Sequence, residues 1–167
     1  AASFLDSVRV SPITDIELDI HKAIGKSVAY STFWNDSYPA QGDKTLTNGK
    51  KGGLSYHDGQ WQGFTSDIDL VVDLDRREEI RRVSAGFMQM PGPGVYFPGE
   101  VLVMVSDNGK NYREIGRVVN HEAPHGAVLK THSFEVKLDK PVMTRYIKLV
   151  ATNVGKGFLF VDEIVVD

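Results

Sequence analysis

The sequence predicts an all-β protein, an antiparallel jelly-roll β-sandwich that forms one domain. Short apolar or β-branched segments recur along the chain, and glycine and proline separate them. No segment sustains the period of 3.6 residues that is typical of an amphipathic helix. The 167 residues match the length of one ordinary domain with a single core.

The expected strands follow one another from residue 26 onward. Residues 101–105 are apolar throughout, as in a central strand that is covered on both faces. Phe134, Val136 and Leu138 alternate with charged residues, which places the three apolar side chains on one face of a strand. The full set of expected strands is 26–32, 68–74, 80–88, 101–105, 133–138, 145–150 and 158–166.

The connections are also readable. Asn108-Gly109 lies between two strands and predicts a tight hairpin, because both residue types tolerate positive φ. The charged run 75–82 is interpreted as a solvated turn, with a single helical turn as the alternative. Residues 1–25 are expected to be a linker or an edge segment from a preceding domain, and the alternation of Ile16, Leu18 and Ile20 permits a short strand there. The chain start suggests a piece of a longer protein.

Composition excludes several classes of protein. Lys and Arg total 19 against 22 Asp and Glu, so the chain carries no basic excess with which to bind nucleic acid. No apolar run approaches the roughly 18 residues that a transmembrane helix needs, so membrane insertion is not expected. The absence of cysteine excludes disulfides, thiolate catalysis and Cys-ligated zinc.

The sequence contains two patterns that resemble catalytic sites, but neither has the context that its chemistry needs. His121-Glu122-Ala123-Pro124-His125 has the letters of a zinc-protease motif, but that chemistry needs a helix, and Pro124 opposes one. The pair Asp67 and Asp69 and the pair Asp73 and Asp75 have strand spacing, yet nothing near them indicates a pocket that would raise one pKa for acid–base catalysis. We therefore expect the domain not to be an enzyme.

Three loops rich in aromatic residues suggest sugar binding. An aromatic ring can stack on the apolar face of a pyranose while nearby polar groups bind its hydroxyls, without any net charge. The residues expected to contact a glycan are Trp34, Tyr38, Tyr56, His57, Gln62, Phe97 and Phe158. Trp61 and Phe64 are interpreted instead as core residues.

Six segments match a known family in order and spacing. They are 45–49 (Thr-Leu-Thr-Asn-Gly), 61–64 (Trp-Gln-Gly-Phe), 68–74, 105–112, 145–149 and 160–164. Residues 26–167 thereby resemble the coagulation factor V/VIII C-type (discoidin) domain, whose bacterial members include the family 32 carbohydrate-binding modules. The resemblance implies an eight-stranded, galactose-binding-domain-like jelly roll. The segment 30–64 is more narrowly similar to the C-terminal module of chitobiase-like β-N-acetylhexosaminidases, family 20 glycoside hydrolases, from Bacteroides-type bacteria.

This resemblance implies a function, partners and a location. The module would be a non-catalytic accessory domain that binds a glycan containing GlcNAc or galactose. Its upstream neighbour would be the catalytic domain of a glycoside hydrolase in the periplasm, on the cell surface or secreted. The alternative is a structural module that packs against that catalytic domain and binds no sugar. The alternative gains weight because Gln62 stands where galactose-binding members place a histidine, and because the Arg and Asn that they use near the third loop are missing from 88–94.

The resemblance also implies a structural calcium ion. Its ligands would be the side chains of Asn48 and Glu163 and the backbone carbonyls of Thr45, Lys50, Gly53 and Asp162. The family usually has Asp at position 48, and the neutral Asn48 should weaken the site. From the residues alone, the Gly- and Lys-rich segment 48–53 is equally well explained as a plain glycine turn.

Overall fold

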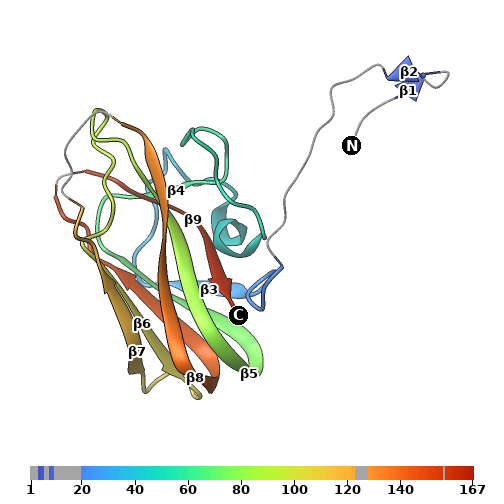
Figure 1. Cartoon of the computed structure of the whole chain (residues 1–167), viewed down its shortest axis with the longest axis vertical. Helices are drawn as coiled ribbons and strands as arrows, with labels where there is room; N and C mark the ends of the chain where they lie inside the picture. The colour runs from blue at the N-terminus through green and yellow to red at the C-terminus, as the bar shows by residue number, and fades with distance from the viewer. Residues whose placement is uncertain (1–3, 6–7, 10–19, 123–127, 156) are drawn as a thin grey trace.

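The computed structural model describes residues 4–5, 8–9, 20–122, 128–155 and 157–167. Their secondary structure is almost entirely antiparallel strand, as expected (Figure 1). The strands are β1 (Phe4–Leu5), β2 (Val8–Arg9), β3 (Ser27–Tyr30), β4 (Gln62–Phe64), β5 (Ile68–Gln89), β6 (Glu100–Ser106), β7 (Arg113–Val119), β8 (Lys130–Ala151) and β9 (Leu159–Val166), with one 3₁₀ helix, η1 (Gly42–Thr47). β1 and β2 pair only with each other.

Two long strands take part in both layers of the sandwich. The first part of β5 pairs with β3 and with the last part of β8, and that part of β8 pairs with β6, which pairs with β7. The second part of β5 pairs with the first part of β8 and with β9, which pairs with β4. The expected strands 68–74 and 80–88 are therefore two halves of β5, and 133–138 and 145–150 are two halves of β8.

The charged run 75–82 is where β5 passes from one layer to the other, so the interpretation as a solvated turn was wrong. These residues stay in the strand, with register irregularities between Asp73 and Glu78 and between Ile80 and Arg82. Asp75 has φ +69°, and its N–H donates to the Asp73 carboxylate at 2.8 Å. Charged side chains suit this bend because most of them reach solvent there.

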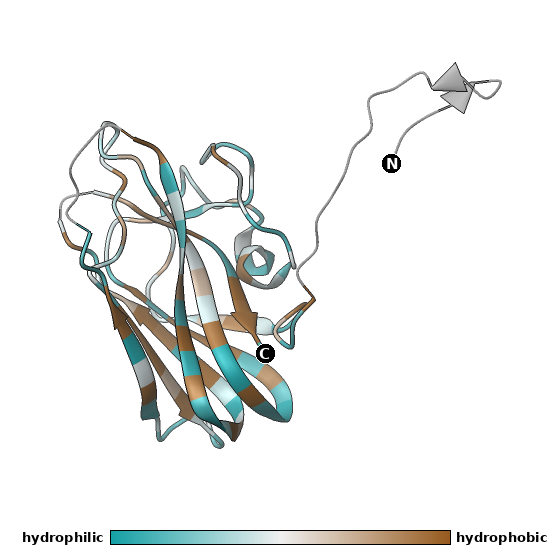
Figure 2. Ribbon diagram, viewed as in Figure 1, coloured by the Kyte–Doolittle hydropathy of each residue, from teal (hydrophilic) through white to brown (hydrophobic). Residues whose placement is uncertain are grey.

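The main core lies between the two layers. Hydropathic alternation along the strands turns one apolar row inward, visible as brown bands in Figure 2. The inward rows include Leu70 and Val72 of β5, Val103 of β6 and Leu149 of β8, each at most 1% exposed. A second, smaller cluster contains Trp61, Met88, Val95 and Phe160. β9 is buried along its whole length because these two clusters and the loops cover both of its faces.

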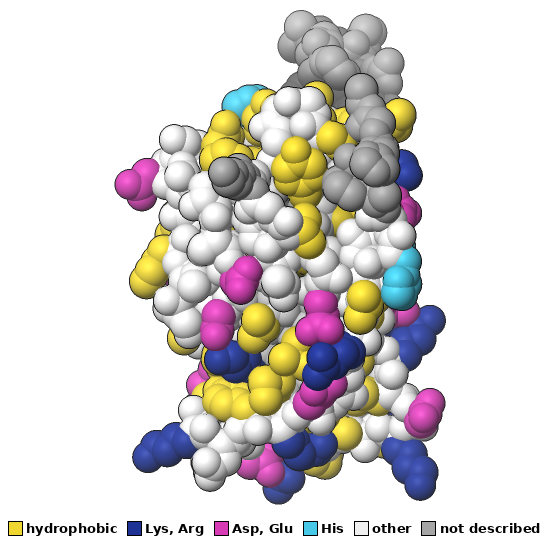
Figure 3. Space-filling model, turned by 90° about the vertical axis from the view of Figure 1, so that its left-hand side faces the viewer, with side chains coloured by type: hydrophobic (Ala, Val, Ile, Leu, Met, Phe, Trp, Pro, Cys, Tyr) yellow, Lys and Arg dark blue, Asp and Glu magenta, His cyan; other side chains and the backbone are white. Residues whose placement is uncertain are grey.

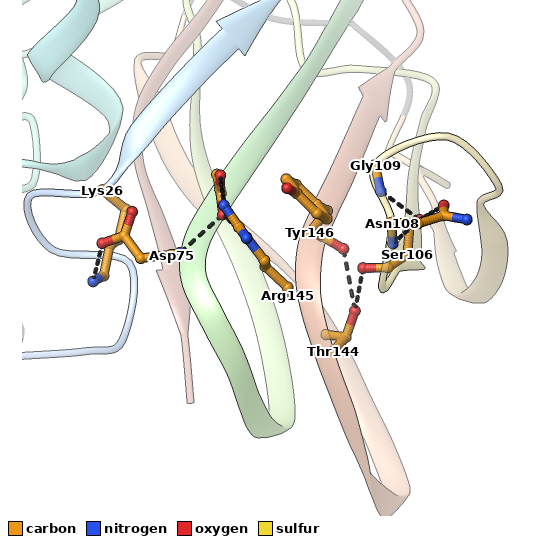
Figure 4. Close-up of polar contacts among 9 residues, drawn as sticks. Lys26, Asp75, Ser106, Asn108, Gly109, Thr144, Arg145 and Tyr146 are labelled. Carbon is orange, nitrogen blue, oxygen red and sulfur yellow. Dashed lines mark hydrogen bonds and ion pairs between the residues drawn. The ribbon is translucent and has the colours of Figure 1, made fainter.

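The predicted hairpin joins β6 to β7, and Gly109 there has φ +68°. Figure 4 shows the contacts that fix it: Gly109 N–H donates to Ser106 Oγ, and Thr144 Oγ1 donates to Ser106 O at 2.9 Å. In the same view Arg145 lies over the Tyr146 ring, 4.8 Å from its centroid, and Lys26 pairs with Asp75. This end of the sandwich is thus closed by turn residues and ion pairs.

Residues 21–25, which the sequence assigns to the linker, pack on the sandwich. Ala23 is fully buried in the main core, and Lys22 N–H donates to Val166 O at 2.8 Å. The packed body therefore begins about five residues before the expected boundary at 26. The strand considered around Ile16 and Leu18 lies outside the described residues. Within the described part of the chain, no helix is long and apolar enough to cross a membrane.

Candidate functional site: an aromatic platform beside a buried carboxylate pair

Four of the seven expected sugar contacts come together at one place. The Tyr38 ring lies 5.8 Å from Tyr56, 6.1 Å from His57 and 5.2 Å from Phe158, measured between centroids. His57 is exposed and the other three are half-buried. Because the four come from three separate segments of the chain, only the fold brings them together. We call this set (Tyr38, Tyr56, His57 and Phe158) the aromatic platform.

Phe160 forms the buried base of the platform, and it was not among the residues expected in the site. Its ring meets Tyr38 edge-on at 4.9 Å and stacks with Tyr56 at 5.3 Å. It is 1% exposed. The sequence does hint at its role. Phe160 in β9 comes two residues after Phe158, and in extended backbone that spacing places both rings on the same side.

Gly63 allows Tyr38 to approach Phe160. A Cβ atom at position 63 would lie 2.8 Å from a Phe160 ring atom and 2.9 Å from Tyr38 Cβ. The same residue fixes the segment that carries Tyr38, since Gly63 N–H donates to Tyr38 O at 3.0 Å and accepts at its own carbonyl from Asn35 N–H at 2.7 Å. The glycine in the Trp-Gln-Gly-Phe segment is therefore a packing requirement of the platform.

Backbone contacts hold the other platform residues. Asp58 closes the loop that carries Tyr56 and His57, because its carboxylate accepts from Gly53 N–H at 2.6 Å and Gln60 N–H at 2.8 Å. Phe158 is fixed through its own backbone, which donates to Gly94 O at 2.8 Å and accepts from Tyr96 N–H at 3.0 Å. The platform thus rests on ordered loops.

Two expected sugar contacts are corrected by their burial. Gln62 is fully buried, and its amide donates to Gly42 O at 2.8 Å while its oxygen accepts from Tyr30 OH at 3.1 Å. Burial raises the pKa of Tyr30 well above its ordinary value, which keeps that hydroxyl a donor. Phe97 is 2% exposed and packs edge-on against Phe134 at 5.7 Å. Neither side chain is presented to a ligand.

Trp34 belongs to a different aromatic group. It meets Tyr30 edge-on at 4.9 Å and Phe33 at 5.9 Å, and it packs against the main core. The structure does not place it with the platform, whereas Phe33 beside it is 69% exposed. Trp61 and Phe64 are core residues, as expected.

None of the four platform side chains is an Asp, Glu, Lys or Arg. Figure 3 shows one side face of the sandwich. Lysine, arginine and carboxylate side chains gather toward the bottom of this view, and few lie toward the top. Aromatic rings with phenol and imidazole groups can stack on an apolar ligand face and form hydrogen bonds at its edge. Such a surface suits a neutral polyhydroxylated ligand better than an ion.

Next to the platform loop, β9 carries two buried carboxylates, Asp162 and Glu163, which are 4% and 1% exposed. Glu163 accepts from Asn48 N–H at 3.2 Å, Gly49 N–H at 2.9 Å and lies 3.0 Å from His21 Nε2. Asp162 accepts from Gly52 N–H at 2.9 Å and from the N–H of Glu163. Burial raises the pKa of Asp162 to about 6.

The expected calcium ligands do not fit a calcium ion as they are arranged. Calcium takes six to eight oxygen ligands whose lone pairs converge on it. Here N–H groups point at both carboxylates, Asn48 Oδ1 accepts from Lys50 N–H at 2.8 Å, and Gly53 O accepts from Trp61 Nε1 at 3.1 Å. Among the described residues no group of three or more His, Cys, Asp or Glu could hold a metal.

The catalytic candidates have structural partners where they are described. Asp69 pairs with Lys148 at 2.8 Å and Asp75 pairs with Lys26 at 2.7 Å. The Arg145 guanidinium holds the pKa of Asp73 below its ordinary value, which is opposite to what a general acid needs. Ala123-Pro124-His125 of the protease-like motif lie outside the described residues, and Glu122 pairs with Lys130 at 3.0 Å.

A family model described as "F5/8 type C domain" matches residues 26–164. The chain belongs to this family. Solved structures with the same fold match the chain at low sequence identity. A search among curated proteins gave no match.

Three similar structures illustrate the fold. CBM32-1 from a family 31 glycoside hydrolase of Clostridium perfringens has 17% identity and a TM-score of 0.56, over 85% of this chain and 93% of that one. The family 32 CBM from C. perfringens NanJ, solved with galactose, has 15% identity and a TM-score of 0.55, over 84% and 92%. Chitosan-binding module 1 from a Paenibacillus sp. IK-5 chitosanase/glucanase has 11% identity and a TM-score of 0.57, over 89% and 99%.

Proposed function

We propose that this F5/8 type C domain is a non-catalytic carbohydrate-binding module whose ligand surface is the aromatic platform. The observation that carries the proposal is the convergence of Tyr38, Tyr56, His57 and Phe158 from three chain segments on the buried Phe160 ring. Half-exposed rings supply apolar stacking faces, and the phenol and imidazole groups supply hydrogen bonds to hydroxyls.

The proposed ligand is a neutral glycan that contains GlcNAc or galactose. Stacking and a few edge hydrogen bonds on an open surface give shallow binding, with Kd of roughly millimolar to micromolar. Galactose is in the complex solved for one structural neighbour, and chitosan is in the name of another, which supports a sugar ligand without choosing between them.

We further propose that the module serves a glycoside hydrolase of the chitobiase-like β-N-acetylhexosaminidase type, in the periplasm, on the cell surface or secreted. The support is the narrower resemblance of segment 30–64 and the glycoside hydrolase named with one structural neighbour. The module would keep that enzyme near its glycan substrate by weak binding.

One observation favours a second candidate function, packing against a neighbouring domain. Phe33 is 69% exposed beside the half-buried Trp34, and its ring contacts are with Tyr30 and Trp34 rather than with a platform residue. Aromatic residues are enriched in the interfaces between proteins relative to the rest of their surfaces. This candidate predicts no response of the platform to sugars.

The test is an NMR titration of the 167-residue chain with GlcNAc, chitobiose and galactose. We expect shifts confined to the platform and its loops, and a loss of about tenfold in affinity, equivalent to ~1.4 kcal/mol, in the Phe158→Ala variant. Phe33→Ala is the matched control, because it removes an exposed aromatic ring elsewhere and should leave the affinity unchanged.

Shifts that cluster on Phe33 and Trp34, or equal losses in the two variants, would contradict the platform as the ligand surface. No shift with any of the three sugars would favour the packing function. A thermal melt of each variant shows that the domain remains folded.

A further inference from the structure

The buried pair Asp162 and Glu163 raises the question of what compensates two adjacent carboxylates inside a strand. A buried carboxylate is stable only when it is paired with a cation or fully hydrogen-bonded. The hydrogen-bond partners of the two carboxylates include N–H groups of a single loop, Asn48, Gly49 and Gly52, together with the His21 ring and the backbone of Glu163 itself.

These contacts make one continuous attachment. Glu163 accepts hydrogen bonds from the N–H groups of Asn48 and Gly49 at the start of the loop. Asp162 accepts a further one from Gly52, a little later in the same loop. Backbone N–H groups that converge on an anion supply positive partial charge. The carboxylates and the N–H groups therefore stabilise each other.

His21 supplies the remaining contact from the N-terminal side of the sandwich. Its Nε2 lies 3.0 Å from Glu163 Oε1, its Nδ1 accepts from Ala23 N–H at 3.2 Å, and both side chains of the pair are fully buried. Because Nδ1 accepts a hydrogen bond, Nε2 carries the hydrogen and donates to Glu163. Residues 21–25 are thus attached to the same carboxylate as the loop.

The loop continues directly to the platform. Gly53 O accepts from Trp61 Nε1, and Gly53 N–H donates to Asp58, the residue that closes the turn carrying Tyr56 and His57. Gly52 lies against the Trp61 indole so closely that a Cβ there would come within 2.1 Å of the ring. The attachment at Asp162 and Glu163 therefore sets the position of the loop segment that carries Tyr56 and His57.

We propose that Asp162, Glu163 and His21 hold the 48–60 loop without a metal ion, and that they are positioning residues for Tyr56 and His57. The first part departs from the calcium that the family resemblance implies, and it rests on the N–H groups that occupy the carboxylates. The second part rests on the proposed function of the platform.

The first experiment concerns the metal and needs no sugar. Thermal melts of the 167-residue chain are compared in excess calcium chloride and in excess chelator. We expect the same Tm in both, because an ion that bound the folded state would raise its stability by RT ln(1 + [L]/Kd) and so raise the Tm in calcium chloride. A Tm that rises with calcium chloride would overturn the metal-free attachment.

The second experiment tests positioning by amide hydrogen exchange. In Glu163→Gln the new amide group must turn an N–H toward N–H donors, so exchange at Asn48 and Gly49 should become about tenfold faster or more. The exchange should also accelerate at 53–60, and the Tyr56 and His57 ring resonances should shift, while amides of β6 stay protected. Glu114→Gln, a surface carboxylate paired with Arg117, is the matched control.

His21→Ala is the second variant if Glu163→Gln does not fold. It removes one donor to Glu163 and leaves the loop N–H groups in place, so a smaller acceleration with the same pattern is expected. Acceleration spread evenly over β6 and the loop, or none at 48–60 in a folded variant, would overturn the positioning role. If these results hold but no sugar binds, the attachment stands and only the function of the platform fails.

Discussion

Replacement of Gly63 by alanine is expected to lower the free energy of unfolding by about 1–3 kcal/mol and to disorder the aromatic platform. The new Cβ would lie 2.8–3.0 Å from Phe160 ring atoms and 2.9 Å from Tyr38 Cβ. Tyr38 cannot withdraw easily, because Gly63 N–H is bonded to its carbonyl. In a domain of this size each kcal/mol corresponds to about 2–4 °C of Tm, which a thermal melt measures.

Gly92→Ala is the control for this variant. Nothing lies within 4 Å of a Cβ built at Gly92, so its Tm should stay within about a degree of the wild type. Ring resonances of Tyr38 and Phe160 should move only in Gly63→Ala. Equal Tm values for the two variants would show that position 63 has room, and would remove the packing explanation for the glycine.

Replacement of Phe97 by alanine is expected to cost about 3–5 kcal/mol of stability, the usual cost of deleting a buried aromatic ring. Phe97 is 2% exposed, and it completes a row of rings in which Phe134 meets both Phe97 and Phe87 edge-on, at 5.7 and 5.4 Å. The side chains that line the cavity left behind would lose their van der Waals contacts with the ring. Denaturant unfolding gives the change in free energy.

Phe97→Leu separates the core role from a ligand contact. It keeps most of the apolar volume, so the domain should fold with a smaller loss of stability. Its affinity for any sugar that binds the wild type should be unchanged, whereas Phe158→Ala loses affinity. A loss of affinity in well-folded Phe97→Leu would restore Phe97 as a ligand contact, against its burial.

The strands could be predicted because their signals are local. Side-chain alternation in 133–138, the apolar run 101–105 and the Asn108-Gly109 turn each report on a few neighbouring residues, and all three are confirmed. The joining of 68–74 to 80–88 was missed. Where one strand passes from one layer to the other, its middle residues are exposed and charged. In the sequence this pattern cannot be told from a solvated turn between two strands.

The site could be predicted only in part, because exposure depends on what covers a segment. Tyr38, Tyr56, His57 and Phe158 meet as a group. Gln62 is instead buried and bonded to Gly42 of η1, and Phe97 is buried against Phe134 of β8. Their residue types are equally suited to a binding loop or to a satisfied interior position. Trp34 and Tyr38 lie in the same short polar segment of the sequence. Yet the Trp34 ring packs against Tyr30, 4.9 Å between centroids, in another aromatic group.

The sequence by itself determined an all-β sandwich of the F5/8 type C family, a slightly acidic and cysteine-free chain, and a surplus of aromatic loop residues. Only the tertiary structure decided which of those aromatics form a platform and which belong to the core. It also decided that Asp162 and Glu163 face N–H groups of a loop more than a hundred residues away in the sequence. Residue type and spacing report local preference, whereas contacts across such separations exist only once both layers have packed.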